Sequence, residues 1–424
     1  MEYQYVIVGG GIAGVTAAET IRENDSLARI AIISEESEIL YSRVLLPSYL
    51  KKRIRRQQLF LRRPSDFTAK RIDLRMNERV AWIDTKHRDV IFENGITVGY
   101  EKLLLATGGR VKEWSDSQDQ QLVFRLQTLE DADRLNSAMD YIHNPLVVGA
   151  SFISLEFLEI FTVRGIAPVL VVRDKHFFSH FVEEQGGQLF NDNFERHGIQ
   201  TVYNDVIAEV KPAQPPDASA QSSGLRQNGT SEMKAITRGL VELPCDAIAV
   251  GIGIERPLAY LEGSGIERGE KGIGTNQFLE TSQPDVFAAG DTAEFFDVIY
   301  GQHKVDGNWT NAVLQGKRAA LNMMGEKQEF RAVAGYSISN LGFQITVLGW
   351  CEDAGDSIVR VEWGKKQYER LFIRDGVIVG AVLVNRFADR THIAKLIEAR
   401  VSLNPWRDKL VDMAFDIHQI PVIP

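Results

Sequence analysis

The sequence is poor in cysteine, and this scarcity excludes several classes of protein. Only two cysteines, Cys245 and Cys351, occur among 424 residues, too few for a thiolate metal site or a disulfide framework. No apolar run approaches the roughly 20 residues that a membrane-spanning helix needs. A strand pattern begins at once in MEYQYVIVGG, so we expect no cleavable signal peptide. These absences predict a cytoplasmic protein.

An excess of positive charge is also missing. The net charge is −9, which argues against binding to nucleic acid or to anionic membranes. One segment departs from this balance: KKRIRRQQLFLRR, residues 51–63, has seven cationic side chains and no acid. It predicts either a cationic docking surface or simply a solvated helix face.

The N-terminal segment YVIVGGGIAGVTAAETIRE predicts a strand, a glycine turn and a helix. Gly9, Gly11 and Gly14 have the GxGxxG spacing. The first allows a tight turn, the second a close approach of pyrophosphate, and the third close packing of the helix on the strand. The helix N-terminus would then offer its N–H groups to the phosphate. The next strand ends in acids, and Glu35 is the candidate for the adenosine ribose. The pattern predicts a dinucleotide site without distinguishing NAD from FAD.

Later segments resemble one known family, the pyridine-nucleotide:flavin oxidoreductases near the ferredoxin, rubredoxin and nitrite reductase flavoproteins. EKLLLATGGR, residues 101–110, is similar to the family's strand–ATG segment. SQPDVFAAGDTAEF, residues 282–295, resembles its second FAD signature. GNWTNAVLQGKRAALNMMG, residues 307–325, resembles the helix whose N-terminus points towards the flavin ring. The resemblance implies FAD, with Asp291 on the ribityl chain.

The resemblance also implies which further residues lie beside the FAD. From the two FAD segments these are Ala106, Thr107, Gly108 and Gly290. Arg43, in YSRVLLPSYL, matches an arginine that would reach the FAD pyrophosphate as a two-pronged donor. The alternative for Arg43 is a surface arginine that caps the loop.

Redox-active cysteines are absent from the flavin-side helix. Disulfide reductases of this family carry a CxxxxC pair there, and other branches carry one cysteine, at the position that Val44 occupies here. We therefore expect both cysteines of this chain to be small core residues. Without a thiol, electrons must pass from the flavin directly to something outside the chain.

A second turn, LVVGASFISLEF at residues 146–157, departs from the family pattern. Gly149 keeps the first glycine, but Ser151 and Ser154 replace the second and third. A β-carbon at residue 151 would point towards the pyrophosphate space, so we expect weakened nucleotide affinity.

The strand after this turn also lacks the acid that holds the 2′-hydroxyl of NADH. Arg173 stands beside that position and favours NADP over NAD, unless it is a solvated charge neutralised by Asp174. Glu156 matches a family glutamate near the nicotinamide pocket, with an ordinary helix-surface acid as the alternative.

The predicted fold class is α/β, with two Rossmann-like dinucleotide-binding domains and a C-terminal α+β domain. We expect the FAD domain at residues 1–112 and 240–326 and the NAD(P)-binding-like domain at 113–239, with a mobile insertion at 211–235. The C-terminal α+β domain, residues 327–424, would pack over the flavin and build a homodimer or partner interface.

The resemblance implies an FAD-dependent oxidoreductase that passes electrons from NAD(P)H through flavin to a redox protein or a small acceptor. An acidic carrier such as a ferredoxin or rubredoxin would dock near residues 51–63. The alternative is a flavin-binding subunit with a degenerate nucleotide site that acts within a complex. No side chain is assigned a catalytic role, because the flavin itself is the reactive group.

Overall fold

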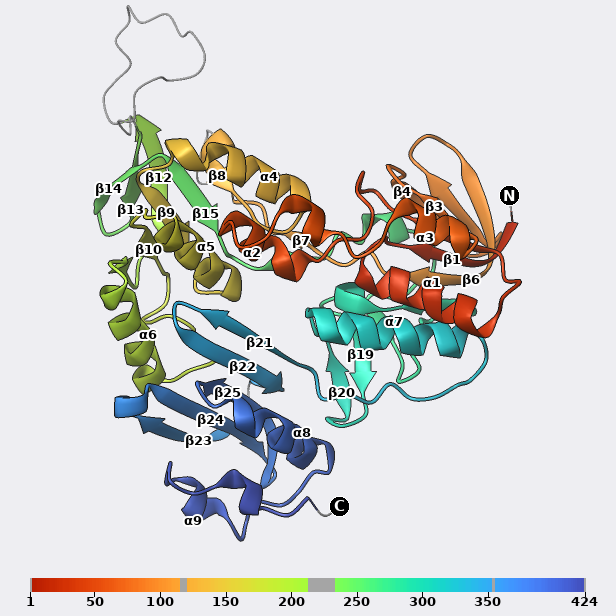
Figure 1. The fold of residues 1–424 in the computed structure, drawn as a ribbon. Coiled ribbons are helices and arrows are strands. Elements are labelled where there is room, and N and C mark those ends of the chain that lie inside the picture. The colour runs from red at the N-terminus through yellow and green to blue at the C-terminus, as the bar shows by residue number, and fades with distance from the viewer. Residues whose placement is uncertain (1, 115–119, 213–232, 353–354, 423–424) are drawn as a thin grey trace, which may run out of the picture.

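The computed structural model describes residues 2–114, 120–212, 233–352 and 355–422. Figure 1 shows three main sheets, each accompanied by helices. The N-terminal sheet lies at one end of the molecule, and the second and C-terminal sheets lie at the other.

The first sheet combines strands from both segments of the predicted FAD domain, residues 1–112 and 240–326. Its order is β3-β2-β1-β6-β5-β4, and β18 pairs with β6 off this path. The strands are β1 (Glu2–Val8), β2 (Ile30–Ile33), β3 (Ile72–Arg75), β4 (Val80–Asp84), β5 (Asp89–Phe92), β6 (Thr97–Leu105) and β18 (Val286–Ala288). Strand β1 runs parallel to β2 and β6, and β18 runs parallel to β6. The carboxyl ends of β1, β6 and β18 therefore share one edge.

Helices α1 (Ile12–Asn24) and α7 (Trp309–Met323) lie side by side on this sheet (Figure 1). They approach closely, because a β-carbon on Gly316 would lie 2.3 Å from the carbonyl oxygen of Ala13. Glycine in α7 thus brings a distant segment against the first glycine turn. Two short helices, α2 (Leu46–Leu50) and α3 (Pro64–Ala69), follow β2.

The second sheet is parallel, in the order β11-β10-β9-β15-β8. Its strands are β8 (Val123–Phe124), β9 (Pro145–Val148), β10 (Val169–Val171), β11 (Gln200–Val202) and β15 (Ala247–Val250). Its helices are α4 (Leu129–Ala138), α5 (Phe152–Val163) and α6 (Glu184–Arg196). An antiparallel sheet adjoins it, made of β12 (Ile207–Pro212), β13 (Met233–Thr237) and β14 (Glu242–Cys245). Most of the predicted insertion, residues 213–232, lies outside the described residues.

The C-terminal sheet is antiparallel, in the order β21-β22-β25-β24-β23. Its strands are β21 (Gly335–Asn340), β22 (Phe343–Gly349), β23 (Asp356–Glu362), β24 (Gln367–Arg374) and β25 (Val377–Val384). Helices α8 (Arg390–Glu398) and α9 (Arg407–Leu410) follow it. The remaining short strands are β7 (Arg110–Val111), β16 (Ile254–Glu255), β17 (Ile273–Thr275), β19 (Ala293–Asp297) and β20 (Gln302–Lys304).

The predicted fold class is confirmed by two mainly parallel sheets with helices and a separate C-terminal α+β unit. The exact domain boundaries stay a prediction. Among the described residues, no helix is long and apolar enough to cross a membrane.

Candidate cofactor site

The first glycine turn is closed tightly by its first and third glycines. Gly9 has a φ of 126°, and a β-carbon there would lie 2.1 Å from the carbonyl oxygen of Ala106. A β-carbon on Gly14 would lie 2.0 Å from the carbonyl oxygen of Gly9. Gly11 is different, because its β-carbon position has no atom within 4 Å. It is the N-cap of α1 and makes no side-chain capping bond. The helix N-terminus is therefore open, as a bound pyrophosphate requires.

The second FAD segment reaches the same edge from β18. The N–H of Gly290 donates to Gln315 Oε1 on α7 at 2.8 Å. Burial raises the pKa of the Asp291 carboxyl, and the nearby cations Arg256 and Arg43 oppose that rise. A carboxyl group that loses solvation at the end of a buried strand is suited to accept hydroxyl hydrogen bonds. These residues fit a flavin's ribityl chain.

The ATG segment at the end of β6 completes this cluster. Thr107 Oγ1 lies 3.2 Å from both the Tyr260 hydroxyl and Thr292 Oγ1, the residue after Asp291. Gly108 has a φ of 68°, which bends the chain after the strand. The structure thus brings together the predicted residues of β1, β6 and β18.

The acids after β2 are arranged differently from each other. Glu35, the predicted ribose ligand, has a 52% exposed side chain and pairs with Arg79 at 3.2 Å. Glu36 instead forms an ion pair with Arg43. Arg43 also donates to the carbonyl oxygen of Gln127 at 2.6 Å. Arg43 is therefore tied on two sides rather than a loose surface arginine, and it stays a predicted pyrophosphate ligand.

The second turn has replaced glycines by a reciprocal pair of hydroxyl caps. Ser151 is the N-cap of α5, and its Oγ accepts from the N–H of Ser154 at 3.2 Å. The N–H of Ser151 donates to Ser154 Oγ at 3.3 Å, and that hydroxyl also donates to the carbonyl oxygen of Gly251 at 3.3 Å. A β-carbon on Gly251 would lie 2.2 Å from Ser154 Oγ. The glycine after β15 thus provides the space for the Ser154 side chain that replaces the third glycine of the turn. Gly251 was not identified from the sequence.

Glu156 is largely buried, so the helix-surface alternative is wrong. Its carboxylate lies 3.2 Å from Lys51 Nζ and 3.1 Å from the amide nitrogen of Asn340 on β21. Lys51, whose side chain is 3% exposed, also pairs with Glu159. Burial raises the pKa of Glu156 and Lys51 opposes that rise. Lys51 was missed from sequence as a site residue, because it was grouped with the basic run.

Arg173 lies on the surface after β10, with a 76% exposed side chain. Its Nε is 3.7 Å from Asp174, and His180 lies 4.0 Å from the same acid. The neutralising role considered for Asp174 is therefore present. An effect of Arg173 on nucleotide choice stays a prediction.

The basic run at residues 51–63 is mostly paired with acids. Arg53 lies 3.4 Å from Glu159, Arg56 contacts Glu38 and Asp133, and Arg62 contacts Glu19. Lys51 is also buried in an ion pair. Within the described ranges, the cations of this run that form no ion pair with an acid are Lys52, Arg55 and Arg63. Any docking surface is narrower than the sequence indicated.

Both cysteines are buried, as predicted. Cys245 closes β14, and Cys351 follows β22. Burial raises the pKa of each thiol to about 12, so neither is a reactive thiolate near neutral pH.

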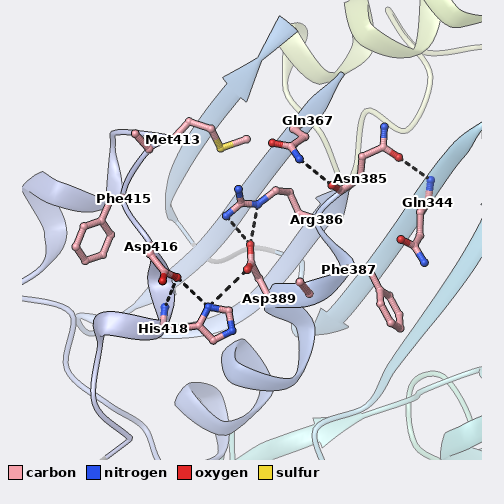
Figure 2. Close-up of a pocket in the computed structure, with 12 residues that line it drawn as sticks. Gln344, Gln367, Asn385, Arg386, Phe387, Asp389, Met413, Phe415, Asp416 and His418 are labelled. Atoms are coloured by element: carbon pink, nitrogen blue, oxygen red, sulfur yellow. Dashed lines mark hydrogen bonds and ion pairs between the residues drawn. The ribbon is translucent and has the colours of Figure 1, made fainter. Parts of the chain in front are cut away.

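A cavity of about 660 Å³ lies elsewhere, against the C-terminal sheet (Figure 2). Its charged side chains bind one another: Arg386 contacts Asp389 at 2.6 Å, and His418 contacts Asp416 at 2.9 Å. None of the predicted cofactor residues lines it. The cavity is therefore separate from the glycine turns.

Two family descriptions match the chain. Residues 3–316 match "Pyridine nucleotide-disulphide oxidoreductase", and residues 339–401 match "Rubredoxin NAD+ reductase C-terminal domain". The chain is 27% identical over 383 residues to Apoptosis-inducing factor 3 of Mus musculus, covering 90% of this chain and 60% of that protein. It thus spans 60% of the length of the first curated relatives.

Other relatives match over nearly their full length. The ferredoxin–NAD(+) reductase component of 3-phenylpropionate/cinnamic acid dioxygenase from Photorhabdus laumondii is 26% identical, with 93% of this chain and 95% of that protein covered. A solved ferredoxin reductase from Rhodopseudomonas palustris superposes with a TM-score of 0.85 at 25% identity, covering 98% and 99% of the two chains. The predicted resemblance is confirmed.

Proposed function

Because the chain belongs to the pyridine nucleotide-disulphide oxidoreductase family, we propose that it is an FAD-dependent reductase without a redox-active disulfide. In this proposal it passes electrons from NAD(P)H through the flavin to a small redox protein. One observation carries the proposal: the flavin-type residues converge on one edge while both thiols of the chain are buried away from exchange. Electrons must then leave the protein directly.

The bound flavin would supply hydride acceptance and release of electrons one at a time. The chain's own residues would bind and orient it. The open N-terminus of α1 at Gly11 would accept the pyrophosphate, and Asp291 would hold the ribityl hydroxyls. Glu156, fixed by Lys51 and Asn340, would border the nicotinamide.

The nicotinamide donor would bind at the second turn with modest affinity. Ser151 and Ser154 already bind each other's N–H groups, so a pyrophosphate must compete with two internal hydrogen bonds. The N–H groups of Phe152 and Ile153, at the first two positions of α5, remain as donors. Arg173 supports NADPH over NADH, although Asp174 opposes it.

The acceptor would be a small acidic electron carrier. The relative from Photorhabdus laumondii is a ferredoxin–NAD(+) reductase component, and such carriers are attracted by a cationic surface. We define the docking surface as Lys52, Arg55 and Arg63, the cations of the basic run with no acidic partner among the described residues. A cytoplasmic location and a homodimer built by the C-terminal domain stay predictions.

An anaerobic titration tests the proposed function. We expect a yellow protein that is bleached by about one equivalent of NADPH or NADH. Bleaching by dithionite alone, with no nucleotide binding by calorimetry, would instead support a flavin subunit of a complex. A protein that takes up no flavin would overturn the proposal.

The docking surface has its own test. We expect the double variant Lys52→Ala/Arg55→Ala to reduce an acidic ferredoxin roughly tenfold more slowly at low salt, and to lose this defect at high salt. The matched control is Arg56→Ala/Arg62→Ala, which removes two cations that already pair with acids. Equal rates for the two double variants would eliminate the docking surface.

A further inference from the structure

Three charged side chains form a buried cluster at the base of α7. Lys304, at the end of β20, lies 2.9 Å from Asp306 and 3.6 Å from Asp297, at the end of β19. The exposed fractions of these side chains are 5% for Lys304, 15% for Asp306 and 3% for Asp297. We call these residues the acid–lysine cluster. One ammonium and two carboxylates leave it a net negative charge unless one carboxylate takes up a proton.

Aromatic and ionisable groups from the β19–β20 turn, from β21 and from the segment after β22 lie around the acid–lysine cluster. Lys304 Nζ lies 4.8 Å from the ring centre of Tyr300 and 5.7 Å from that of Trp350. The charge of Glu352 raises the pKa of Asp306, and the charge of Asp306 raises the pKa of Tyr336. The charges of Asp297, Asp306 and Cys351 likewise raise the pKa of Tyr300. Such low-polarity walls weaken solvation, so the charge state of the cluster has a strong local effect.

The acid–lysine cluster adjoins the predicted flavin site through the chain itself. Asp306 is followed by Gly307 and by Asn308, the N-cap of α7. A β-carbon on Gly307 would lie 3.5 Å from Asp291 Oδ2. The carbonyl oxygen of Asp306 accepts from the amide of Asn311 in the first turn of α7 at 3.0 Å. Asp306 is thus built into the helix end that would face the flavin. In Figure 1, β19 and β20 lie beneath this end of α7.

We propose that Asp306 is a positioning residue that exchanges one proton with solvent and so sets the charge beside the flavin site. This inference rests on the proposed function. Electrons from the nicotinamide donor would add negative charge to a bound flavin, and a proton taken from solvent onto the Asp306 carboxylate would offset that charge. No bond of the cofactor is made or broken in this exchange.

The electrostatics of the cluster support such an exchange near neutral pH. The pKa of Asp306 is raised from 3.8 to about 6, chiefly by burial; Lys304 lowers it, and Asp297 and Glu352 contribute to the rise. Negative charge added nearby would raise this pKa again. At a pH between the pKa of Asp306 in the oxidised protein and its higher pKa in the reduced protein, reduction is accompanied by uptake of one extra proton.

The test is the midpoint potential of the flavin, measured with redox dyes from pH 5 to pH 8. We expect the wild-type potential to fall more steeply above about pH 6, with a slope equivalent to one extra proton for two electrons. Asp306→Asn should remove this steeper segment. The dyes deliver electrons without a nucleotide, so the result does not depend on NAD(P)H binding.

Two variants of the same cluster serve as matched controls. Asp297→Asn removes a carboxylate that raises the pKa of Asp306, so the steeper segment should begin at a lower pH. Lys304→Met removes the opposing cation, so it should begin at a higher pH. If Lys304→Met fails to fold, Asp297→Asn alone keeps the direction testable.

Unfolding of the flavin-free protein gives a second measurement. A carboxyl whose folded pKa is about 6 against an ordinary 3.8 stabilises the fold fully below the lower value. That stability is lost as the pH rises from about 4 to about 6, and Asp306→Asn should lack this loss. A flavin-loaded protein with the same potential slope before and after Asp306→Asn would overturn the inference and leave the proposed function intact. A colourless protein would instead overturn the proposed function.

Discussion

The two glycine turns begin alike and are then stabilised in different ways. Gly9 and Gly149 both have positive φ values, 126° and 107°, directly after a parallel strand. In the first turn, Gly14 lets α1 approach until no β-carbon fits against the Gly9 carbonyl. In the second, Ser154 occupies that position, and Gly251, directly after the neighbouring strand β15, provides the room. The glycine that is missing from the helix at Ser154 is thus replaced by a glycine on the other side of the contact, at Gly251.

The helix N-termini differ for the same reason. Gly11 leaves the N-terminus of α1 without a side-chain cap, whereas Ser151 and Ser154 cap α5 from within. An anion meets open donors at the first turn and partly engaged donors at the second. We therefore expect the first turn to hold a dinucleotide more firmly than the second.

The largest expected effect, on both stability and flavin binding, comes from adding a side chain at the close contact in the first turn. Gly14→Ala forces a β-carbon to within 2.0 Å of a backbone oxygen, so we expect a loss of about 3 kcal/mol of unfolding free energy and loss of bound flavin. Gly11→Ala is the control, since its β-carbon meets no protein atom. It should keep the unfolding free energy of the flavin-free protein while weakening flavin binding. Equal destabilisation by both would contradict the comparison.

The next effect tests the exchange of glycine between strand and helix. Gly251→Ala places a β-carbon 2.2 Å from Ser154 Oγ, and we expect it to destabilise the protein by about 1–2 kcal/mol. Adding Ser154→Gly should recover part of this loss, because the hydroxyl is then gone. Chemical denaturation of the four combinations measures the coupling. Strict additivity would mean that the two residues are independent.

A smaller effect, on NADPH affinity, is expected from a substitution that makes the second turn resemble the first. Ser151→Gly frees the N–H of Ser154 and removes a β-carbon from the predicted phosphate space. We expect NADPH affinity to rise about fivefold, equivalent to roughly 1 kcal/mol, as measured by calorimetry. Ser151→Ala keeps the β-carbon, so it should lose about 1 kcal/mol of helix capping without the full gain in affinity. Unchanged affinity in the glycine variant would exclude competition by the cap.

The smallest effect concerns nucleotide choice after β10. Asp174→Asn removes the acid that lies 3.7 Å from Arg173, so we expect the preference for NADPH over NADH to rise about threefold, within the range of a surface ion pair. Arg173→Ala should move the preference in the opposite direction. Ratios of kcat/KM for the two donors measure both changes. If neither ratio moves, Arg173 is only a solvated charge.

The fold class and family were predictable because their signals are local and occur in series. Gly9, Gly11 and Gly14 lie within six residues of one another, and the later FAD segments follow in the expected order. Each segment needs only its own strand end and turn to be interpretable. The buried state of both cysteines was also predicted, since neither lies near the flavin segments.

The rest depended on partners that are distant in sequence. Lys51 looked like one cation in a basic run, but its acids lie on α5, more than a hundred residues away. The pairing of Arg56 with Asp133 has the same cause. Gly251 was not identified from the sequence, because the room it provides is for Ser154, which lies 97 residues away. Sequence spacing records neither the ion pairs of a run nor the counterpart of a substituted glycine.

The sheltered thiols have a practical consequence for chemical labelling. Cys245 and Cys351 are the only sulfhydryl groups of the chain, and both lie in the interior. Val44, by contrast, has a relative exposure of 58%. A cysteine introduced there would be the single addressable attachment point for a spin label or fluorophore, so distance measurements would need no prior removal of native sulfur.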